Sequence, residues 1–352
     1  MLTIRTISGE GGTEQLDYIL RNPRSLLYAN PRFIELVAKH LDARAAWIEA
    51  RRDGAIAGVL PFLAKDGTLG PVFNSMAFYG SNGGVIQHIH DEEAKLGLVA
   101  AFYQEANSAS ACSATLITNP LEQDSEFYEA ATEYTFRDER IGQITHFPEI
   151  EHVDDLMAHF QDPRPRNIRR ALKQGIVVEK SRGEEALDFL YWTHKANILA
   201  AGGLPKSKAF FDAIRSTMHD EDWAVFTARL GQRLIAAVLL FYCNRTVEYF
   251  TPVIVEKYRI TQAPALVIYK AMQDAMQSGY SNWNWGGTWL TQTGVYDFKK
   301  RWATSEYRYY YYTRVYNPAL MSCKSDYLLG HYPGFFVLPF RNLLQEKEGS
   351  HA

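Results

Sequence analysis

The sharpest charge feature of the sequence is a basic run between Pro163 and Val178, a stretch that contains no Asp or Glu. As a helix, this run places cations at spacings of three and four residues, so that they share one face. Such a face can bind the phosphates of a nucleotide-linked molecule or of an RNA end through charge-assisted hydrogen bonds. A solvated helix face is the alternative. The candidate residues for binding these phosphates are Arg166, Arg169, Arg170 and Lys173.

Strand and helix patterns downstream of this run predict one domain. Residues 223–229, 233–241 and 246–251 read as three strands, the first two joined at a glycine. Apolar residues at helical spacing predict an amphipathic helix over 264–278, and a short aromatic strand follows over 281–285. These elements must position any site that lies beside the basic run.

The first half of the chain repeats this layout, which indicates a duplicated domain. Residues 47–63 form the same unit of strand, glycine turn and strand, and a helix over 92–107 and a strand over 114–118 are expected next. We therefore predict an α/β (mixed α+β) fold of two similar domains, each a twisted mixed sheet flanked by helices. The predicted limits are 1–150 for the first domain, 151–316 for the second and 317–352 for a C-terminal segment.

The order of three strands, a helix and a strand, followed by the run Gly294–Lys299, resembles the FemAB-like branch of the GNAT superfamily. The best-known members of that branch add amino acids to peptidoglycan precursors. Pro165–Gly175, and Tyr258-Arg259 ahead of a helix opened by Pro264, also carry the resemblance. It implies two tandem GNAT-like domains, the first on the acceptor side and the second on the donor side. The C-terminal segment would pack back on the first domain.

The resemblance assigns catalysis to the pair Phe298-Lys299, which in the bridge-forming transferases contacts the donor near the reacting ester. Aminolysis of an ester passes through a tetrahedral intermediate, and an ammonium held beside the developing oxyanion lowers the barrier. The alternative is that Lys299, Lys300 and Arg301 form a solvated basic turn. We expect Lys299 to be catalytic and Phe298 to bind the donor.

The strand over 246–251 occupies the place where GNAT folds open a gap between two parallel strands. Pro252 cannot donate to a sheet ladder, so a strand that splays or ends there is expected. Tyr249 or Thr251 could then line a tunnel for the donor, and Glu248 or Tyr249 could relay a proton from the attacking amine. Because side chains alternate along a strand, only one or two of the three can face the site.

The loop ahead of the expected helix bears on the identity of the donor. In CoA-dependent GNAT enzymes this loop is rich in glycine, so that backbone N–H groups wrap a pyrophosphate at the helix N-terminus. Here Gln262 stands in the place of a glycine, and Pro264 has no N–H. This departure favours aminoacyl-tRNA over acyl-CoA as the donor, and acyl-CoA stays open. Arg259 and Gln262 are the candidate donor-binding residues of this loop.

A polar, glycine-rich turn over residues 78–84 is expected near the acceptor cleft, with Tyr79 and Asn82 as candidate acceptor-binding residues. A plain loop is the alternative, because the glycine spacing fits neither a dinucleotide fingerprint nor a nucleophile elbow. His88 and His90 lack a further His or Cys pair at ligand spacing. We therefore predict no metal, and no cofactor besides the donor substrate.

The composition is that of an ordinary globular protein. Lys and Arg total 37 against 40 Asp and Glu, a net charge of −3, so DNA is not an expected partner and any RNA contact must be local. Three separated cysteines (Cys112, Cys243 and Cys323) indicate a reducing compartment, and we expect the cytoplasm. No apolar run reaches the roughly 18 residues of a spanning helix, so any membrane contact would be peripheral.

The resemblance to the FemAB-like branch leaves two classes of function open. The first is a transferase that moves an aminoacyl group from aminoacyl-tRNA, or an acyl group from acyl-CoA, to an amine of a cell-envelope, glycan or peptide precursor. The second is a GNAT-like binding module that has lost its chemistry and recruits an envelope precursor or a partner protein. Lys299 and the intact run that precedes it favour the enzyme.

Overall fold

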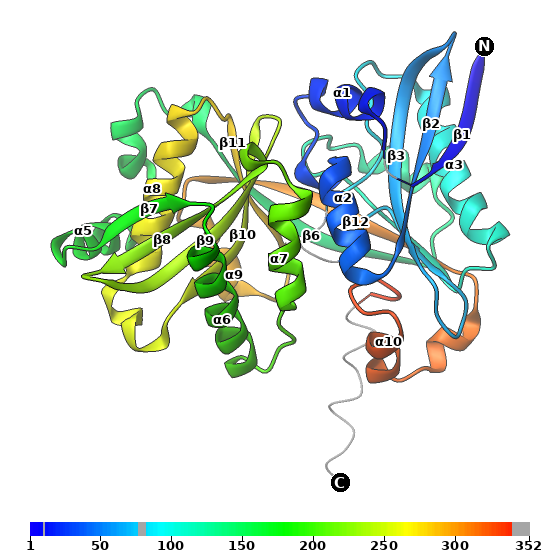
Figure 1. The fold of residues 1–352 in the computed structure, drawn as a ribbon. Coiled ribbons are helices and arrows are strands. Elements are labelled where there is room, and N and C mark those ends of the chain that lie inside the picture. The colour runs from blue at the N-terminus through cyan, green and yellow to red at the C-terminus, as the bar shows by residue number, and fades with distance from the viewer. Residues whose placement is uncertain (10, 77–81, 340–352) are drawn as a thin grey trace. The chain divides into compact units, whose positions relative to one another are not determined.

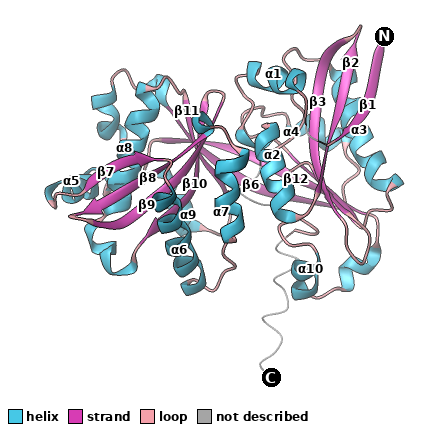
Figure 2. Ribbon diagram, viewed as in Figure 1, coloured by secondary structure: helices cyan, strands magenta, loops and turns pink. Residues whose placement is uncertain are grey.

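The computed structural model describes residues 1–9, 11–76 and 82–339. The chain divides into two compact units, Met1–Ile141 with Arg308–Ala352 (unit 1) and Gly142–Tyr307 (unit 2) (Figure 1). Each unit combines strands and helices (Figure 2), which confirms the predicted mixed α/β class. The domain boundaries predicted at residues 150 and 316 stay a prediction.

Unit 1 is built on a sheet with the strand order β1-β2-β3-β4-β5-β12. The β2–β3 hairpin turns at Asp53-Gly54, where both residues have positive φ, as a tight hairpin of this kind requires. The strands are β1 (Leu2–Ser8), β2 (Arg44–Arg52), β3 (Ala55–Lys65), β4 (Val72–Asn74), β5 (Ser113–Ile117) and β12 (Thr304–Val315). The helices are α1 (Thr13–Arg21), α2 (Pro31–Leu41), α3 (Glu92–Ser108), α4 (Ser125–Ala131) and α10 (Ser325–His331).

The C-terminal residues pack within unit 1. The Tyr332 hydroxyl donates to the Gly70 carbonyl (2.8 Å), and the Ser113 hydroxyl donates to the Val337 carbonyl (2.8 Å). Tyr332 is fully buried, so this contact belongs to the core of the unit. The C-terminal residues Phe336 and Val337 therefore pack against β4 and β5 within unit 1.

Unit 2 has the strand order β6-β11-β10-β9-β8-β7. Its strands are β6 (Phe136–His146), which begins in unit 1, β7 (Val177–Ser181), β8 (Trp223–Leu230), β9 (Arg233–Cys243), β10 (Thr246–Ile254) and β11 (Asn282–Trp289). Its helices are α5 (Arg164–Lys173), α6 (Glu184–Ala200), α7 (Lys208–Thr217), α8 (Ala263–Gln277) and α9 (Thr293–Lys300). The 3-10 turns of the two units are η1 (Leu27–Ala29), η2 (Phe147–Glu149), η3 (Val153–His159), η4 (Asp220–Asp222), η5 (Glu256–Thr261) and η6 (Pro318–Ser322).

The sheet of unit 2 has a helix layer on each face. One core cluster joins α5 and α8 to alternate residues of the strands, such as Phe226, Val238 and Leu240. On the other face, Phe210 of α7 stacks on Phe250 of β10, with ring centroids 6.0 Å apart. The elements predicted as strands over 223–229 and 233–241 and as a helix over 264–278 are all present in this unit.

Candidate active site

The two central parallel strands of unit 2 diverge soon after they pair. The described register of β10 and β11 ends at Glu248 opposite Asn284, whereas β10 continues to Ile254 and β11 to Trp289. A bulge at Phe250 also shifts the pairing of β10 with β9. This is the gap that the sequence predicted.

Of the two outcomes expected at Pro252, a strand that splays or a strand that ends, the structure shows the first. β10 runs past Pro252, which lies opposite Val238 of β9. A proline is tolerated here because β11 has already separated from β10, so the missing N–H removes no ladder bond to that strand.

The bulge places the candidate residues of β10 on two faces. Tyr249 lies opposite Leu240 and Thr251 opposite Leu239, and neighbouring residues of β9 face opposite ways. Tyr249 packs on Trp285, with centroids 4.8 Å apart, on the face covered by α8. Thr251 is buried on the opposite face, and its hydroxyl has no hydrogen-bond partner within the described part of the chain.

Glu248 is fully buried and accepts a hydrogen bond from the Asn284 amide, 3.1 Å away. It therefore sits on the face opposite Tyr249, at the point where the two strands separate. Burial raises the pKa of the Tyr249 phenol, with a smaller opposing effect from Arg164. Tyr249 is thus a neutral hydroxyl at physiological pH and a weak base.

Lys299 is buried near the C-terminal end of β11. Its Nζ donates to the carbonyls of Gly286 (3.1 Å) and Gly287 (3.0 Å) and to the hydroxyl of Thr288 (2.9 Å). Only 7% of the residue is exposed, and burial lowers the pKa of Lys299 to about 7, whereas the three oxygen acceptors favour the charged form. Lys300, in contrast, is exposed. The solvated-turn alternative therefore does not describe Lys299.

A buried network holds the acceptor of this lysine. The Thr288 hydroxyl donates to the Gln143 side chain (3.2 Å), and the Gln143 amide donates to the Tyr296 carbonyl (3.1 Å). The network links β11, β6 and α9, so Lys299 is held between three elements of unit 2. Thr288 and Gln143 belong to no motif that the sequence analysis used, and only their contacts in the structure identify them as part of the Lys299 site.

Arg164 is a second buried cation that the sequence did not single out from its run. Its guanidinium lies 4.3 Å from the Phe298 ring centroid and 5.3 Å from that of Trp302, and its Nη2 donates to the Phe298 carbonyl (3.3 Å). Burial, and to a lesser degree repulsion from Arg301, lowers the pKa of Arg164 to about 10. An unusually buried arginine in this run is visible only in the tertiary structure.

The other cations of α5 face solvent and line a surface hollow together with Gln174. Within the described residues, none of these cations has an acidic partner at ion-pair distance. The Gln174 amide donates to the Thr261 carbonyl (3.0 Å), so the hollow adjoins the start of α8. These cations are Arg166, Arg169, Arg170 and Lys173.

The start of α8 is closed, in the sense that its first backbone N–H groups are absent or bonded within the loop. Gln262 has φ of 63°, the left-handed conformation that a glycine would adopt without strain. The N–H of Ala263 bonds the Thr261 hydroxyl (3.2 Å), and the N–H of Ala265 bonds the Gln262 carbonyl (3.0 Å). The N–H groups that would wrap a pyrophosphate are therefore absent or already bonded. Arg259 is exposed beside this loop and pairs with Glu256.

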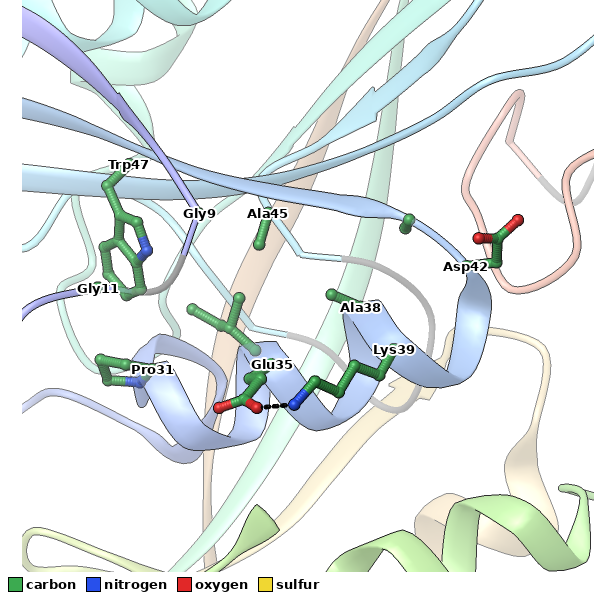
Figure 3. A pocket seen from close by; sticks show the side chains of 11 residues that line it. Gly9, Gly11, Pro31, Glu35, Ala38, Lys39, Asp42, Ala45 and Trp47 are labelled. Carbon is green, nitrogen blue, oxygen red and sulfur yellow. Dashed lines mark hydrogen bonds and ion pairs between the residues drawn. The ribbon is translucent and has the colours of Figure 1, made fainter.

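In unit 1, Tyr79 lies outside the described residues, and Asn82 is buried. Both polar atoms of the Asn82 side chain have no hydrogen-bond partner in the described structure. A separate hollow of about 220 Å³ lies between α2 and the start of β2 (Figure 3), with Trp47 at one end and Lys39 paired with Glu35 at its rim. It contains none of the predicted site residues.

Comparisons with known proteins identify a GNAT domain in part of the chain and the fold of the whole. Residues 164–300 match the model of the acetyltransferase (GNAT) domain, which spans α5 to α9 and the candidate site. A search of curated protein sequences finds no match. The structures similar to this chain include tandem GNAT proteins, and the predicted fold of two tandem GNAT-like domains is confirmed.

Individual structures agree with this fold at low sequence identity. FemX has a TM-score of 0.70 and 16% identity, covering 90% of this chain and 99% of FemX. A tandem GNAT protein from the clavulanic acid biosynthesis pathway has a TM-score of 0.54 and 12% identity, covering 89% and 98%. L-PGS from Bacillus licheniformis has a TM-score of 0.54 and 13% identity, covering 89% and 94%. The predicted resemblance to the FemAB-like branch is thus confirmed in the fold.

Two further properties concern metals and membranes. Over residues 1–9, 11–76 and 82–339, no cluster of three or more His, Cys, Asp or Glu side chains is placed to hold a metal ion. In the same part of the chain, no helix has the length and apolar character needed to cross a bilayer.

Proposed function

We propose that this protein is a transferase that moves an aminoacyl or acyl group to an amine of a cell-envelope, glycan or peptide precursor. The observation that carries the proposal is the buried Lys299, held by three oxygen acceptors at the end of β11 beside the gap between β10 and β11. A desolvated ammonium is a strong electrostatic group, because the low dielectric around it weakens screening.

In this reaction the acceptor amine attacks the donor carbonyl carbon, and a new C–N bond forms as the carbonyl oxygen gains negative charge. The bond to the leaving oxygen or sulfur then breaks, and the attacking nitrogen loses a proton. The Lys299 ammonium stabilises the oxyanion by exchanging one of its three acceptors for that oxygen. Either Glu248 or Tyr249 relays this proton to the leaving group, because the two side chains lie on opposite faces of β10 and only one of them can face the reacting atoms.

For the donor, the closed start of α8 supports aminoacyl-tRNA over acyl-CoA. A pyrophosphate finds no free N–H at Ala263 or Ala265 and none at Pro264. Phe298, with its aromatic neighbours, packs against the donor on the face covered by α8. Thr251 is the donor-binding candidate of the opposite face, since its buried hydroxyl has no hydrogen-bond partner among the described residues. Arg259 and Gln262 contact the donor at the mouth of the loop.

The exposed cations of α5, which have no acidic partner among the described residues, bind phosphates of the acceptor precursor or of the RNA end, since both present the same anionic oxygens. Asn82 of unit 1 stays a candidate acceptor-binding residue, because its buried amide has no hydrogen-bond partner among the described residues and a ligand that bonds it would offset that cost. The proposed location is the cytoplasm, where charged tRNA and nucleotide-linked precursors occur, with no cofactor besides the donor.

The second candidate is a binding module of the same fold. It is favoured by the fact that all three donors of Lys299 are already bonded within the protein, as in a purely structural lysine. The enzyme forms a transfer product, and the binding module does not. The test is mass spectrometry of the products formed when the purified protein is incubated with charged tRNA or acyl-CoA and a panel of amine acceptors. Transfer at a rate that depends on Lys299 supports the enzyme, and binding without any product supports the module.

A further inference from the structure

Arg164 is a buried cation for which the described structure offers no anionic partner. About nine-tenths of the residue is buried, and no carboxylate of the described residues lies at ion-pair distance from its guanidinium. Its Nε is buried and has no hydrogen-bond partner in the part of the chain that the structure describes. Burying a charge in this way costs several kcal/mol in real proteins unless other groups compensate. The compensation must therefore come from the groups that the guanidinium touches.

Those groups belong to the C-terminal turn of α9 and the residues that follow it. The guanidinium stacks on Phe298 at 4.3 Å and lies 5.3 Å from Trp302, and its Nη2 reaches the Phe298 carbonyl at 3.3 Å. The last carbonyls of a helix have no partner within the helix and carry the negative end of its dipole. A cation that bonds one of them and stacks on an aromatic face is stabilised by both interactions.

We infer that Arg164 is a positioning residue that caps the C-terminus of α9 and thereby holds Lys299 against Gly286, Gly287 and Thr288. The Phe298 carbonyl and the backbone N–H of Lys299 belong to one planar peptide group. The hydrogen bond from Arg164 to this carbonyl therefore fixes the orientation of the backbone to which the Lys299 side chain is attached. This inference rests on the role proposed for Lys299 in transfer, but the geometry of Lys299 can be tested without it.

The decisive variant is Arg164→Gln, which removes the charge and the planar guanidinium. Without the cap, α9 is expected to loosen and water to reach Lys299, so the pKa of Lys299 rises from about 7 toward that of a free lysine. Burial is the cause of the lowered Lys299 pKa, with no contribution from the charge of Arg164, so the change reports solvation. NMR titration of protein labelled at lysine Cε, with Lys299→Met to assign the signal, measures this pKa.

Two other variants separate positioning from general damage. Arg164→Lys keeps the charge and should restore part of the effect, which also covers the case in which Arg164→Gln folds poorly. Arg182→Gln is the matched control, because the Arg182 Nε also donates to a backbone carbonyl, that of Trp223 at 2.9 Å, away from α9. It should leave the Lys299 titration and the hydrogen exchange of α9 unchanged.

In the transfer assay, Arg164→Gln should lower kcat between about tenfold and a hundredfold, because a misplaced catalytic group loses rate. The alkaline fall in activity should move to higher pH with the pKa of Lys299. An unchanged Lys299 titration and unchanged α9 exchange in both Arg164 variants would overturn the inference. A shifted titration in a protein that transfers nothing would uphold the positioning role and reject the proposed function.

Discussion

The Nζ of Lys299 lies 2.9 Å from the hydroxyl of Thr288, which in turn donates to Gln143 across to β6. A threonine hydroxyl accepts from the lysine and donates to the amide at once, so one small side chain links two buried polar groups. Within the described residues, the lysine is therefore held by a network and has no acidic partner. All three of its N–H donors are bonded, so a ligand oxygen must replace one of the three acceptors.

We expect Thr288→Val to destabilise the protein by about 1–3 kcal/mol, since it leaves a donor of Lys299 and the Gln143 oxygen unsatisfied while keeping the shape. Thr288→Ser retains the hydroxyl and should cost less. Urea unfolding followed by circular dichroism measures both. Equal stability of Thr288→Val and the unmodified protein would show that water replaces the hydroxyl.

Lys299→Met should lower the transfer rate by about a hundredfold or more, because it deletes the charge that meets the oxyanion and keeps the packing of the stem. Lys300→Met is the matched control, because Lys300 is the next residue of α9 and is exposed. It should transfer at the unmodified rate. Turnover is measured at saturating donor and acceptor. Equal rates for Lys299→Met and the unmodified protein would show that groups other than Lys299 stabilise the oxyanion.

The stability of the protein should depend on pH through Lys299. Its pKa is lowered to about 7 in the folded state, so between that pH and about 10.5 the unfolded state binds more protons and stability rises with pH. The contribution is on the order of a few kcal/mol. The difference in unfolding free energy between Lys299→Met and the unmodified protein, measured at pH 7 and pH 10, isolates it. A difference that does not change with pH would contradict the lowered pKa.

Isothermal titration with acetyl-CoA should show weak or no binding to the unmodified protein. The double variant Gln262→Gly, Pro264→Ala should bind more tightly, because it adds one N–H at the start of α8 and keeps the left-handed turn without strain. Pro264→Ala alone is the matched control for the added N–H. Low-micromolar binding by the unmodified protein would make acyl-CoA the preferred donor.

Arg169→Gln with Arg170→Gln should weaken binding of a short RNA that carries the tRNA acceptor end and should reduce its salt dependence by about one unit of slope for each lost phosphate contact. Arg215→Gln, on the exposed side of α7, should change neither. Fluorescence anisotropy at several salt concentrations measures the slope. An unchanged slope would leave the basic face as a solvated surface.

The sequence by itself determined the class of fold and most of its elements. Strands over 223–229 and 233–241 and the helix over 264–278 follow from local periodicity, and local periodicity survives in any tertiary setting. The sequence also identified the Phe298-Lys299 dipeptide and the presence of Gln262 in the place of a glycine, because both depend only on residue type at a known spacing.

Only the tertiary structure decided which charges are buried. Arg164 and Arg166 are two residues apart in one basic run, yet the first is enclosed by Phe298 and Trp302 and the second faces solvent. The network of Thr288 and Gln143 joins residues 145 positions apart. Burial and long-range hydrogen bonds arise when distant elements pack, and since they set the dielectric around Lys299, they also determine its chemistry.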